Sequence, residues 1–165
     1  MIALSLSNVK NCMAQLLLKE TFDDFLFIEG EIVTAHTFTI DGFTQKSFFE
    51  EDTADIFNYA LWKDIRDYCF SIIKGRRTPL SFKFIFSLNP IKIASLVSDF
   101  GIDWDPSDIQ GLYLNFKYDG EKLQCITGTS LKTFSLDKTI ERVWDRKVQE
   151  LFSNHEIAYE NLELH

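Results

Sequence analysis

Residues 80–88, LSFKFIFSL, decide the fold of this chain. Every second residue from Leu80 to Leu88 is Leu or Phe, and only Ile85 breaks the alternation with smaller or polar side chains. Successive side chains of a β-strand point to opposite faces of a sheet, so the large apolar side chains share one face. The stretch therefore predicts a strand whose phenylalanine face lies against a hydrophobic core.

Further strands are expected on both sides of this stretch. Residues 112–118 show the same alternation, and residues 123–127 are expected to form the antiparallel strand that follows. Asp119-Gly120 between them supplies a tight hairpin turn. Residues 25–40 are rich in aromatic and β-branched residues, and Glu29-Gly30 within them predicts a second hairpin turn. These segments predict a mainly antiparallel sheet.

Four segments have apolar residues spaced three and four apart, which predicts amphipathic helices. The longest of the first three covers residues 55–74 and has a polar stripe opposite its apolar one. The residues expected to cap or end the four helices are Ser7, Thr53, Gly75, Asn89-Pro90, Gly101 and Asp137.

The order of these elements predicts the fold class. Each half of the chain runs strand, short helix, hairpin and long helix, so we expect an α+β fold with a β-α-β-β-α pseudo-repeat. Amphipathic helices would pack on one face of a single antiparallel sheet. The same order also permits a ferredoxin-like unit over residues 2–88 followed by an extension. We assign residues 1–153 to a single domain and residues 154–165 to an acidic C-terminal tail.

The composition favours a soluble globular protein and argues against a nucleic-acid-binding one. The 165 residues are 45% hydrophobic and 25% charged, which is typical of a soluble globular protein, and 16 phenylalanines predict a bulky core. The net charge of −8 repels polyanions and argues against nucleic acid as a partner.

The three cysteines Cys12, Cys69 and Cys125 have no C-x-x-C spacing and predict neither a disulfide framework nor a zinc ribbon. A reducing compartment suits them best. The start of the chain lacks the features of a signal peptide, and no apolar run is long enough to span a membrane. We therefore expect a cytoplasmic protein without a membrane segment.

Two groups of residues are candidates for binding a small anion. Arg76 and Arg77 follow a helix end and carry the guanidinium groups that suit carboxylates and phosphates. Thr129, Ser130 and Lys132 follow Gly128, whose open backbone amides suit an anion. The alternatives are that the arginines complement the helix dipole and that the second group is an ordinary turn.

Phe43, Phe48 and Phe49 stand among otherwise polar residues and are candidates for a protein interface. The alternative is a third strand that buries them. The charge is also uneven, with −7 over residues 1–55 (three cations, ten anions) and +4 over residues 56–100 (seven cations, three anions). The acidic first hairpin of one copy would suit the basic middle of another, unless both are simply solvated faces.

Trp104 is a further interface candidate, because it is a large aromatic residue in an acidic loop. It is expected either to cover the core or to contact a partner. Four carboxylates surround it, a composition that hard cations favour, but their spacing matches no known calcium loop. We therefore predict no metal site from the four acids Asp99, Asp103, Asp105 and Asp108.

The chain holds little histidine. We expect His36 to be a hydrogen-bonded imidazole in the core and His155 to interact with the end of the last helix. Dinucleotide-binding, phosphate-loop, zinc-protease, nucleophile-elbow and calcium-loop motifs do not occur, so no cofactor is predicted.

These observations favour a non-catalytic binding or protein-interaction domain, with a protein partner or a second copy of the chain, over an enzyme. The second interpretation is an enzyme or carrier for a small anionic ligand held by Arg76, Arg77 and the Thr129-Ser130 turn. A third is a clamp-like protein associated with nucleic acid, which the pseudo-repeat suggests and the net charge opposes.

Three short stretches in the second half of the chain resemble a small family of uncharacterised bacterial cytosolic proteins. They are Ile126-Thr-Gly-Thr-Ser-Leu131, Ser135-Leu-Asp-Lys138 and Val143-Trp-Asp145. The resemblance implies a bacterial origin and a cytosolic setting. It includes no catalytic signature, so it assigns no role to any residue.

Overall fold

The alternating stretch forms strand β5 (Ser81–Ser87), and its three phenylalanines are at most 2% exposed. In the computed structural model, which describes residues 1–162, β5 lies near the middle of one sheet with the strand order β3-β2-β5-β6-β7-β1-β8. Every strand pair is antiparallel, and β4 pairs with β2 off this path. The other described strands are β1 (Ala3–Leu6), β2 (Leu26–Val33), β3 (Thr37–Asp41), β4 (Ala60–Leu61), β6 (Ile109–Tyr118), β7 (Leu123–Leu131) and β8 (Tyr159–Leu162).

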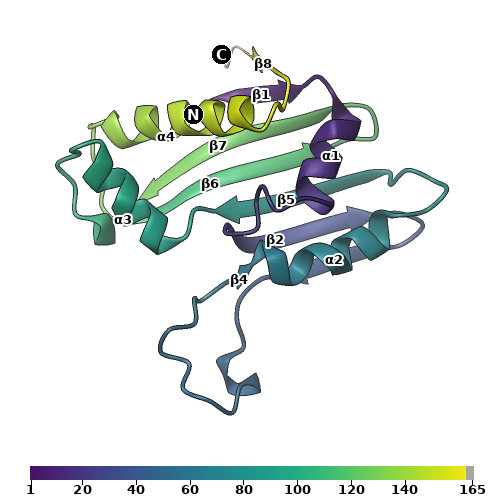
Figure 1. Ribbon diagram of the computed structural model, residues 1–165, viewed down its shortest axis with the longest axis horizontal. Coiled ribbons are helices and arrows are strands. Elements are labelled where there is room, and N and C mark those ends of the chain that lie inside the picture. The colour runs from purple at the N-terminus through teal and green to yellow at the C-terminus, as the bar shows by residue number, and fades with distance from the viewer. Residues whose placement is uncertain (163–165) are drawn as a thin grey trace.

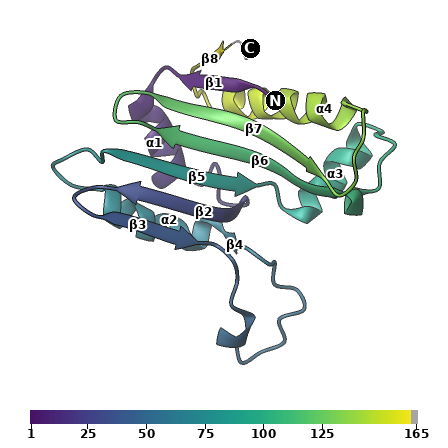
Figure 2. The ribbon, with the colours of Figure 1, turned by 180° about the vertical axis from the view of Figure 1, so that it is seen from behind.

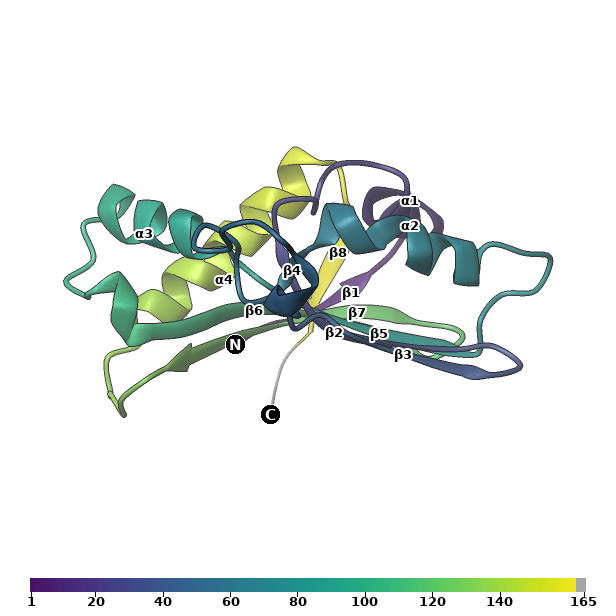
Figure 3. The ribbon, with the colours of Figure 1, turned by 90° about the horizontal axis from the view of Figure 1, so that it is seen from below.

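Four α-helices cover one face of the sheet, as Figure 3 shows in side view. They are α1 (Val9–Leu17), α2 (Trp62–Ile73), α3 (Pro90–Asp99) and α4 (Thr139–Asn154), and two 3₁₀ turns occur at Lys46–Phe48 and Pro106–Asp108. The described helices leave the opposite face of the sheet uncovered (Figures 2 and 3). The predicted α+β fold, a mainly antiparallel sheet with helices on one face, is confirmed. None of the helices in residues 1–162 is long and apolar enough to cross a membrane.

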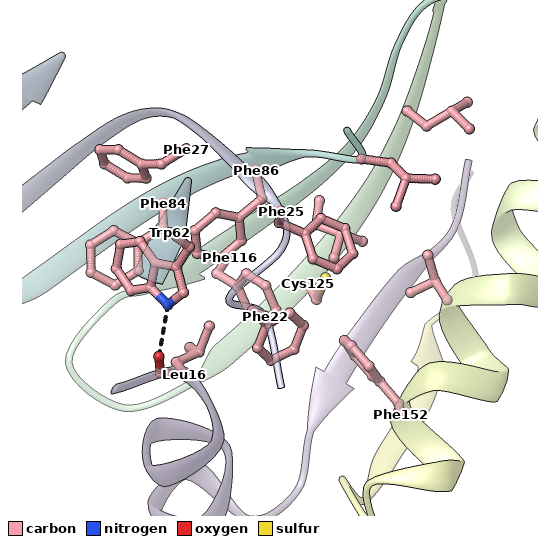
Figure 4. Close-up of a cluster of buried hydrophobic side chains, with 14 of the residues drawn as sticks. Leu16, Phe22, Phe25, Phe27, Trp62, Phe84, Phe86, Phe116, Cys125 and Phe152 are labelled. Carbon is pink, nitrogen blue, oxygen red and sulfur yellow. Dashed lines mark hydrogen bonds between the residues drawn. The ribbon is translucent and has the colours of Figure 1, made fainter. Parts of the chain in front are cut away.

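Aromatic rings form the centre of the core between the sheet and the helices (Figure 4). Phe86 packs at ring-centroid distances of 4.9 Å from Trp62 and 5.6 Å from Phe116. The indole N–H of Trp62 would be costly to bury without a partner, and it donates to the backbone carbonyl of Leu16 at 2.8 Å. This contact ties the start of α2 to the end of α1 above β5.

The prediction of a hairpin turn at Glu29-Gly30 is wrong, because β2 runs straight through both residues to Val33. Gly30 is buried, and a Cβ there would lie 2.8 Å from Cζ of Phe27 and 3.0 Å from Cδ1 of Phe84. Packing of two rings against the backbone, and not a turn, therefore requires glycine at this position.

The turn between β2 and β3 instead covers residues 34–36, where the Thr34 N–H donates to the carbonyl of His36 at 2.9 Å. His36 is exposed in this turn, so its predicted place in the core is also wrong. His155 lies at the expected position as the C-cap residue of α4, where its backbone N–H donates to the carbonyl of Leu151.

Several helix boundaries differ from the predictions, whereas the ends at Gly75 and Gly101 are confirmed, because Lys74 and Phe100 are the C-cap residues of α2 and α3. The N-cap residue of α4 is Lys138 and not Asp137.

Helix α2 begins at Trp62 and not at residue 55, and Asn8 caps α1 in place of Ser7. The Asn89-Pro90 cap is confirmed, since the Asn89 side chain accepts a hydrogen bond from the Lys92 N–H at 2.9 Å. Leu80 lies outside β5 and is 66% exposed, so it does not share the phenylalanine face.

The two halves of the chain contribute to the same sheet. Strand β5 of the second half lies between β2 and β6, and β1 lies between β7 and β8. Because β1 pairs with neither β2 nor β5, residues 2–88 do not form the ferredoxin-like alternative. The Asp119-Gly120 turn is confirmed, with Gly120 at φ +99° between β6 and β7.

Part of the segment expected to be an acidic tail belongs to the sheet. Strand β8 pairs with β1, and Ile157 just before it is 3% exposed. Residues 163–165 of the expected tail lie outside the described residues.

We predict that Phe86→Ala lowers the free energy of unfolding by about 3–5 kcal/mol, because it removes a fully buried ring. Urea unfolding followed by circular dichroism measures the change. The matched control is Phe134→Ala, whose ring is 89% exposed and whose effect we expect to stay within about 0.5 kcal/mol. Equal effects of the two substitutions would contradict the placement of β5 in the core.

Candidate functional site

The two groups of anion candidates lie at opposite ends of the sheet. Arg76 and Arg77 are exposed in the loop between α2 and β5. Thr129 and Ser130 lie at the end of β7, with Lys132 just beyond it. The start of β5 pairs with the end of β6, whereas the end of β7 pairs with the start of β6. The structure therefore does not bring the arginines and the Thr129–Lys132 group together.

The Thr129–Lys132 group lines a pocket of about 350 Å³ between the end of β7 and the start of α4. The Ser130 hydroxyl donates to Oε1 of Gln110 at 2.9 Å, and the buried Thr129 hydroxyl has no hydrogen-bond partner among the described residues. The charged lining residues are Lys132, Lys138, Asp137 and Glu141. Because two cations and two anions balance, the pocket has no net positive charge that would select an anion.

Trp104 lies in the loop that precedes the second 3₁₀ turn, and it connects this loop to the start of α4. Its indole N–H donates to Oδ2 of Asp137 at 3.1 Å, and its side chain is half-buried. Asp137 also accepts hydrogen bonds from the backbone N–H and the hydroxyl of Thr139, at 2.9 and 2.6 Å. The Thr139 contacts, followed by the Trp104 contact, lower the pKa of the Asp137 carboxyl. Trp104 thus has an intramolecular partner at its polar end.

Asp105, in the acidic loop that also contains Trp104, takes part in local turn chemistry. The Asp105 carboxylate accepts hydrogen bonds from the backbone N–H and the hydroxyl of Ser107, which lower its pKa. Within residues 1–162, no three His, Cys, Asp or Glu side chains are grouped closely enough to hold a metal ion.

The segment between β3 and β4, which we call the 42–59 loop, projects from the sheet (Figures 1 and 2). Its base is fixed by backbone pairing. The Gly42 N–H donates to the carbonyl of Ile28, and the Ala60 N–H donates to the carbonyl of Gly42, both at 2.8 Å. Phe43 and Tyr59 form a further antiparallel bridge. The loop thus leaves the sheet and returns at the same point of β2.

The three candidate interface phenylalanines lie at the surface of the 42–59 loop. Phe43 is 50% exposed, Phe48 84% and Phe49 45%. Phe48 and Phe49 form an edge-to-face pair with ring centroids 5.7 Å apart. All three line a hollow of about 830 Å³, and the alternative third strand does not form at Phe48 and Phe49. The three rings therefore form an exposed apolar surface around one hollow.

The hollow beside these phenylalanines has an acidic lining. Asp41, Asp55 and Asp64 line it, and no described lysine or arginine does. Three more exposed acids, Glu50, Glu51 and Asp52, follow Phe49 along the loop. The exposed rings are thus surrounded by negative charge.

A second hollow, of about 320 Å³, lies on the other side of the same loop and was not predicted. It is bounded by residues 57–59, the start of α3, the second 3₁₀ turn and the start of β6. Tyr59 and Tyr113 line it, and no charged side chain among the described residues does. These side chains come from segments far apart in the sequence and belong to no motif, so sequence reasoning had no signal for them.

Comparison with known proteins identifies one family. A model described as a family of unknown function (DUF5721) matches residues 15–160, which covers both halves of the chain. Neither a curated protein nor a solved structure matches the sequence.

We predict that Asp137→Asn lowers the melting temperature more at pH 7 than at pH 3. The native pKa of Asp137 lies below its unfolded value, so its ionised form stabilises the fold above the unfolded pKa of about 3.9. This contribution is lost as the pH falls through the native pKa. Thermal unfolding at both pH values tests the difference, and equal losses at pH 7 and pH 3 would contradict it.

We predict that none of the three cysteines reacts with thiol reagents in the folded protein. All three are buried and unpaired; burial raises the pKa of Cys12 and Cys69 to about 12 and that of Cys125 well above its usual range. Only the thiolate is reactive, so labelling at pH 8 should wait for unfolding. Absorbance with Ellman's reagent, with and without guanidinium chloride, measures this, and rapid labelling of the native chain would contradict it.

Proposed function

Because the chain belongs to the DUF5721 family, whose function is unknown, we propose its function from its geometry: a non-catalytic protein-interaction domain that docks through the 42–59 loop. The observation that carries the proposal is the exposure of Phe43, Phe48 and Phe49 around one acidic hollow. A few buried residues provide most of the binding energy at protein interfaces, and large aromatic side chains contribute strongly when a partner buries them.

The occupant we propose is the loop at residues 74–80 of a second copy of the chain. This loop contains Lys74, Arg76 and Arg77, all exposed, and ends at Leu80, which is 66% exposed. It supplies cations to face the acids of the hollow and an apolar side chain to pack on its phenylalanines.

Contact between two 42–59 loops is disfavoured by charge. Residues 41–64 contain six acids and two lysines, so two such loops repel each other. Association is therefore expected to be head to tail, with unlike surfaces in contact.

The two loops of one chain lie apart in the structure (Figure 1). The 42–59 loop is attached to β2 at Ile28, whereas Leu80 is attached at the far end of β2 through its N–H bond to the carbonyl of Val33. Contact between the loops thus needs two molecules, and each copy has one free surface of each kind.

The proposed setting is the bacterial cytosol. Three buried, unpaired cysteines suit a reducing compartment. The resemblance of residues 126–145 to bacterial cytosolic proteins supports the same assignment.

We predict that the chain self-associates in a concentration-dependent manner, measured by sedimentation velocity at low ionic strength. Phe48→Ser with Phe49→Ser removes one surface, and Arg76→Glu with Arg77→Glu removes the other. Each double variant alone should associate at least tenfold more weakly than the unaltered chain, about 1.4 kcal/mol or more. Added salt should also weaken the association.

An equimolar mixture of the two double variants is the decisive experiment. Each variant retains the surface that the other has lost. The mixture should therefore form 1:1 dimers but no larger oligomers. Phe134→Ser, which alters an exposed ring outside the loop, is the matched control and should associate normally. An unaltered chain that stays monomeric at all concentrations, or a mixture that stays monomeric, would overturn the proposal.

A further inference from the structure

We propose that the 320 Å³ hollow between the 42–59 loop and the start of β6 binds a small uncharged hydroxylated molecule of monosaccharide size. We call it the Tyr59–Tyr113 pocket. The inference does not rest on self-association, because Phe48, Phe49, Arg76 and Arg77 do not line this pocket, although Phe57 and Tyr59 line both hollows.

The chemistry of the lining decides the ligand class. Half a dozen side chains can form hydrogen bonds, and the rest are apolar or proline. The hydrogen-bonding side chains are Asn58, Tyr59, Ser87, Ser107, Gln110 and Tyr113. Since no described charged side chain lines the pocket, a charged ligand would lose its hydration there without an opposite charge to replace it. The occupant is therefore neutral.

Four of these side chains have donors that are free for a ligand. In residues 1–162, the hydroxyls of Tyr59 and Tyr113 donate no hydrogen bond to the protein, and neither do the side-chain amides of Asn58 and Gln110. By contrast, the hydroxyls of Ser87 and Ser107 donate to a backbone carbonyl and to the Asp105 carboxylate. Two hydroxyls and two amides present both donors and acceptors, which suits a ligand with several hydroxyl groups.

The position of Tyr113 is supported by the glycine two residues before it. A Cβ at Gly111 would lie 2.3 Å from Cζ and 2.5 Å from the hydroxyl of Tyr113. Only glycine at position 111 therefore leaves room for the Tyr113 ring and hydroxyl, and Tyr113 lines the pocket. Burial, with a smaller contribution from Tyr59, raises the pKa of Tyr113, so its hydroxyl stays protonated and can donate at neutral pH.

The remaining lining supplies apolar contact. Ile28, Phe57 and Ile93 face the cavity, and ligand pockets commonly combine such surfaces with a few polar groups. A sugar ring has one hydroxyl-rich periphery and apolar C–H faces, which matches this division. The volume is at the small end of the range for ligand pockets, which excludes oligosaccharides as the fully enclosed occupant.

Saturation-transfer NMR with the full chain tests the proposal. The probes are a panel of neutral hexoses and pentoses, their phosphate esters, and free nucleosides, each at millimolar concentration. We expect transfer to at least one neutral sugar and none to its phosphate ester. Binding of nucleosides alone, binding of the esters as tightly as the sugars, or no binding by any probe would overturn the proposal.

Variants locate the bound sugar. Tyr113→Phe removes one hydroxyl and keeps the ring, and Asn58→Ala removes one amide; each should weaken binding at least fivefold while thermal unfolding stays near that of the unaltered chain. The matched control is Tyr68→Phe, which removes a hydroxyl from a side chain that is 69% exposed on α2. Binding that survives both pocket substitutions would overturn the assignment to this pocket.

Discussion

The packing of Trp62 onto Phe84 and Phe86 is the contact on which the rest of the structure depends. The ring centroids lie 5.3 and 4.9 Å apart, and all three side chains are fully buried. Because the indole N–H must find an acceptor, the carbonyl of Leu16 and thus the end of α1 are held in the same place. One cluster therefore fixes two helices of the first half against a strand of the second half. It also commits the helices to a single face of the sheet.

The local sequence pattern predicted the strands that have one buried face along their whole length. It failed where the conformation depends on contacts with residues distant in the sequence. Period-two alternation identified β5 and β6, because their apolar faces meet the core along their length. Gly30 looked like a turn residue, but two rings from β2 and β5 occupy the space of its missing side chain. The predicted start of α2 is too early because residues 58–61 pair with residues 26–27 and 42–44, and the Ile56 N–H donates to the carbonyl of Thr53 in a turn. No local signal reports such pairing.

The candidate surfaces were predictable in part. The polar residues around Phe43, Phe48 and Phe49 identified them as interface candidates. Their burial depended on a third strand, which Phe48 and Phe49 do not form. Arg76 and the Thr129–Lys132 group have residue types that suit one shared anion site. They lie at opposite ends of the sheet, because the start of β5 pairs with the end of β6 and the end of β7 pairs with its start. Tyr59 and Tyr113 are 54 positions apart (113 minus 59) and meet only through the return of a loop. Their proximity follows from the topology and not from any motif.

The way the 42–59 loop is attached bears on how this fold can change over generations. Its base is held by main-chain hydrogen bonds and by Gly42, where a Cβ would lie 1.8 Å from the carbonyl oxygen of Phe27. Main-chain bonds place little demand on side-chain identity, so the residues between the two anchors can mutate, lengthen or shorten without cost to the sheet. The docking surface that we propose can thus diversify among homologues while the scaffold stays constant, and an invariant glycine at the anchor would be the mark of that arrangement.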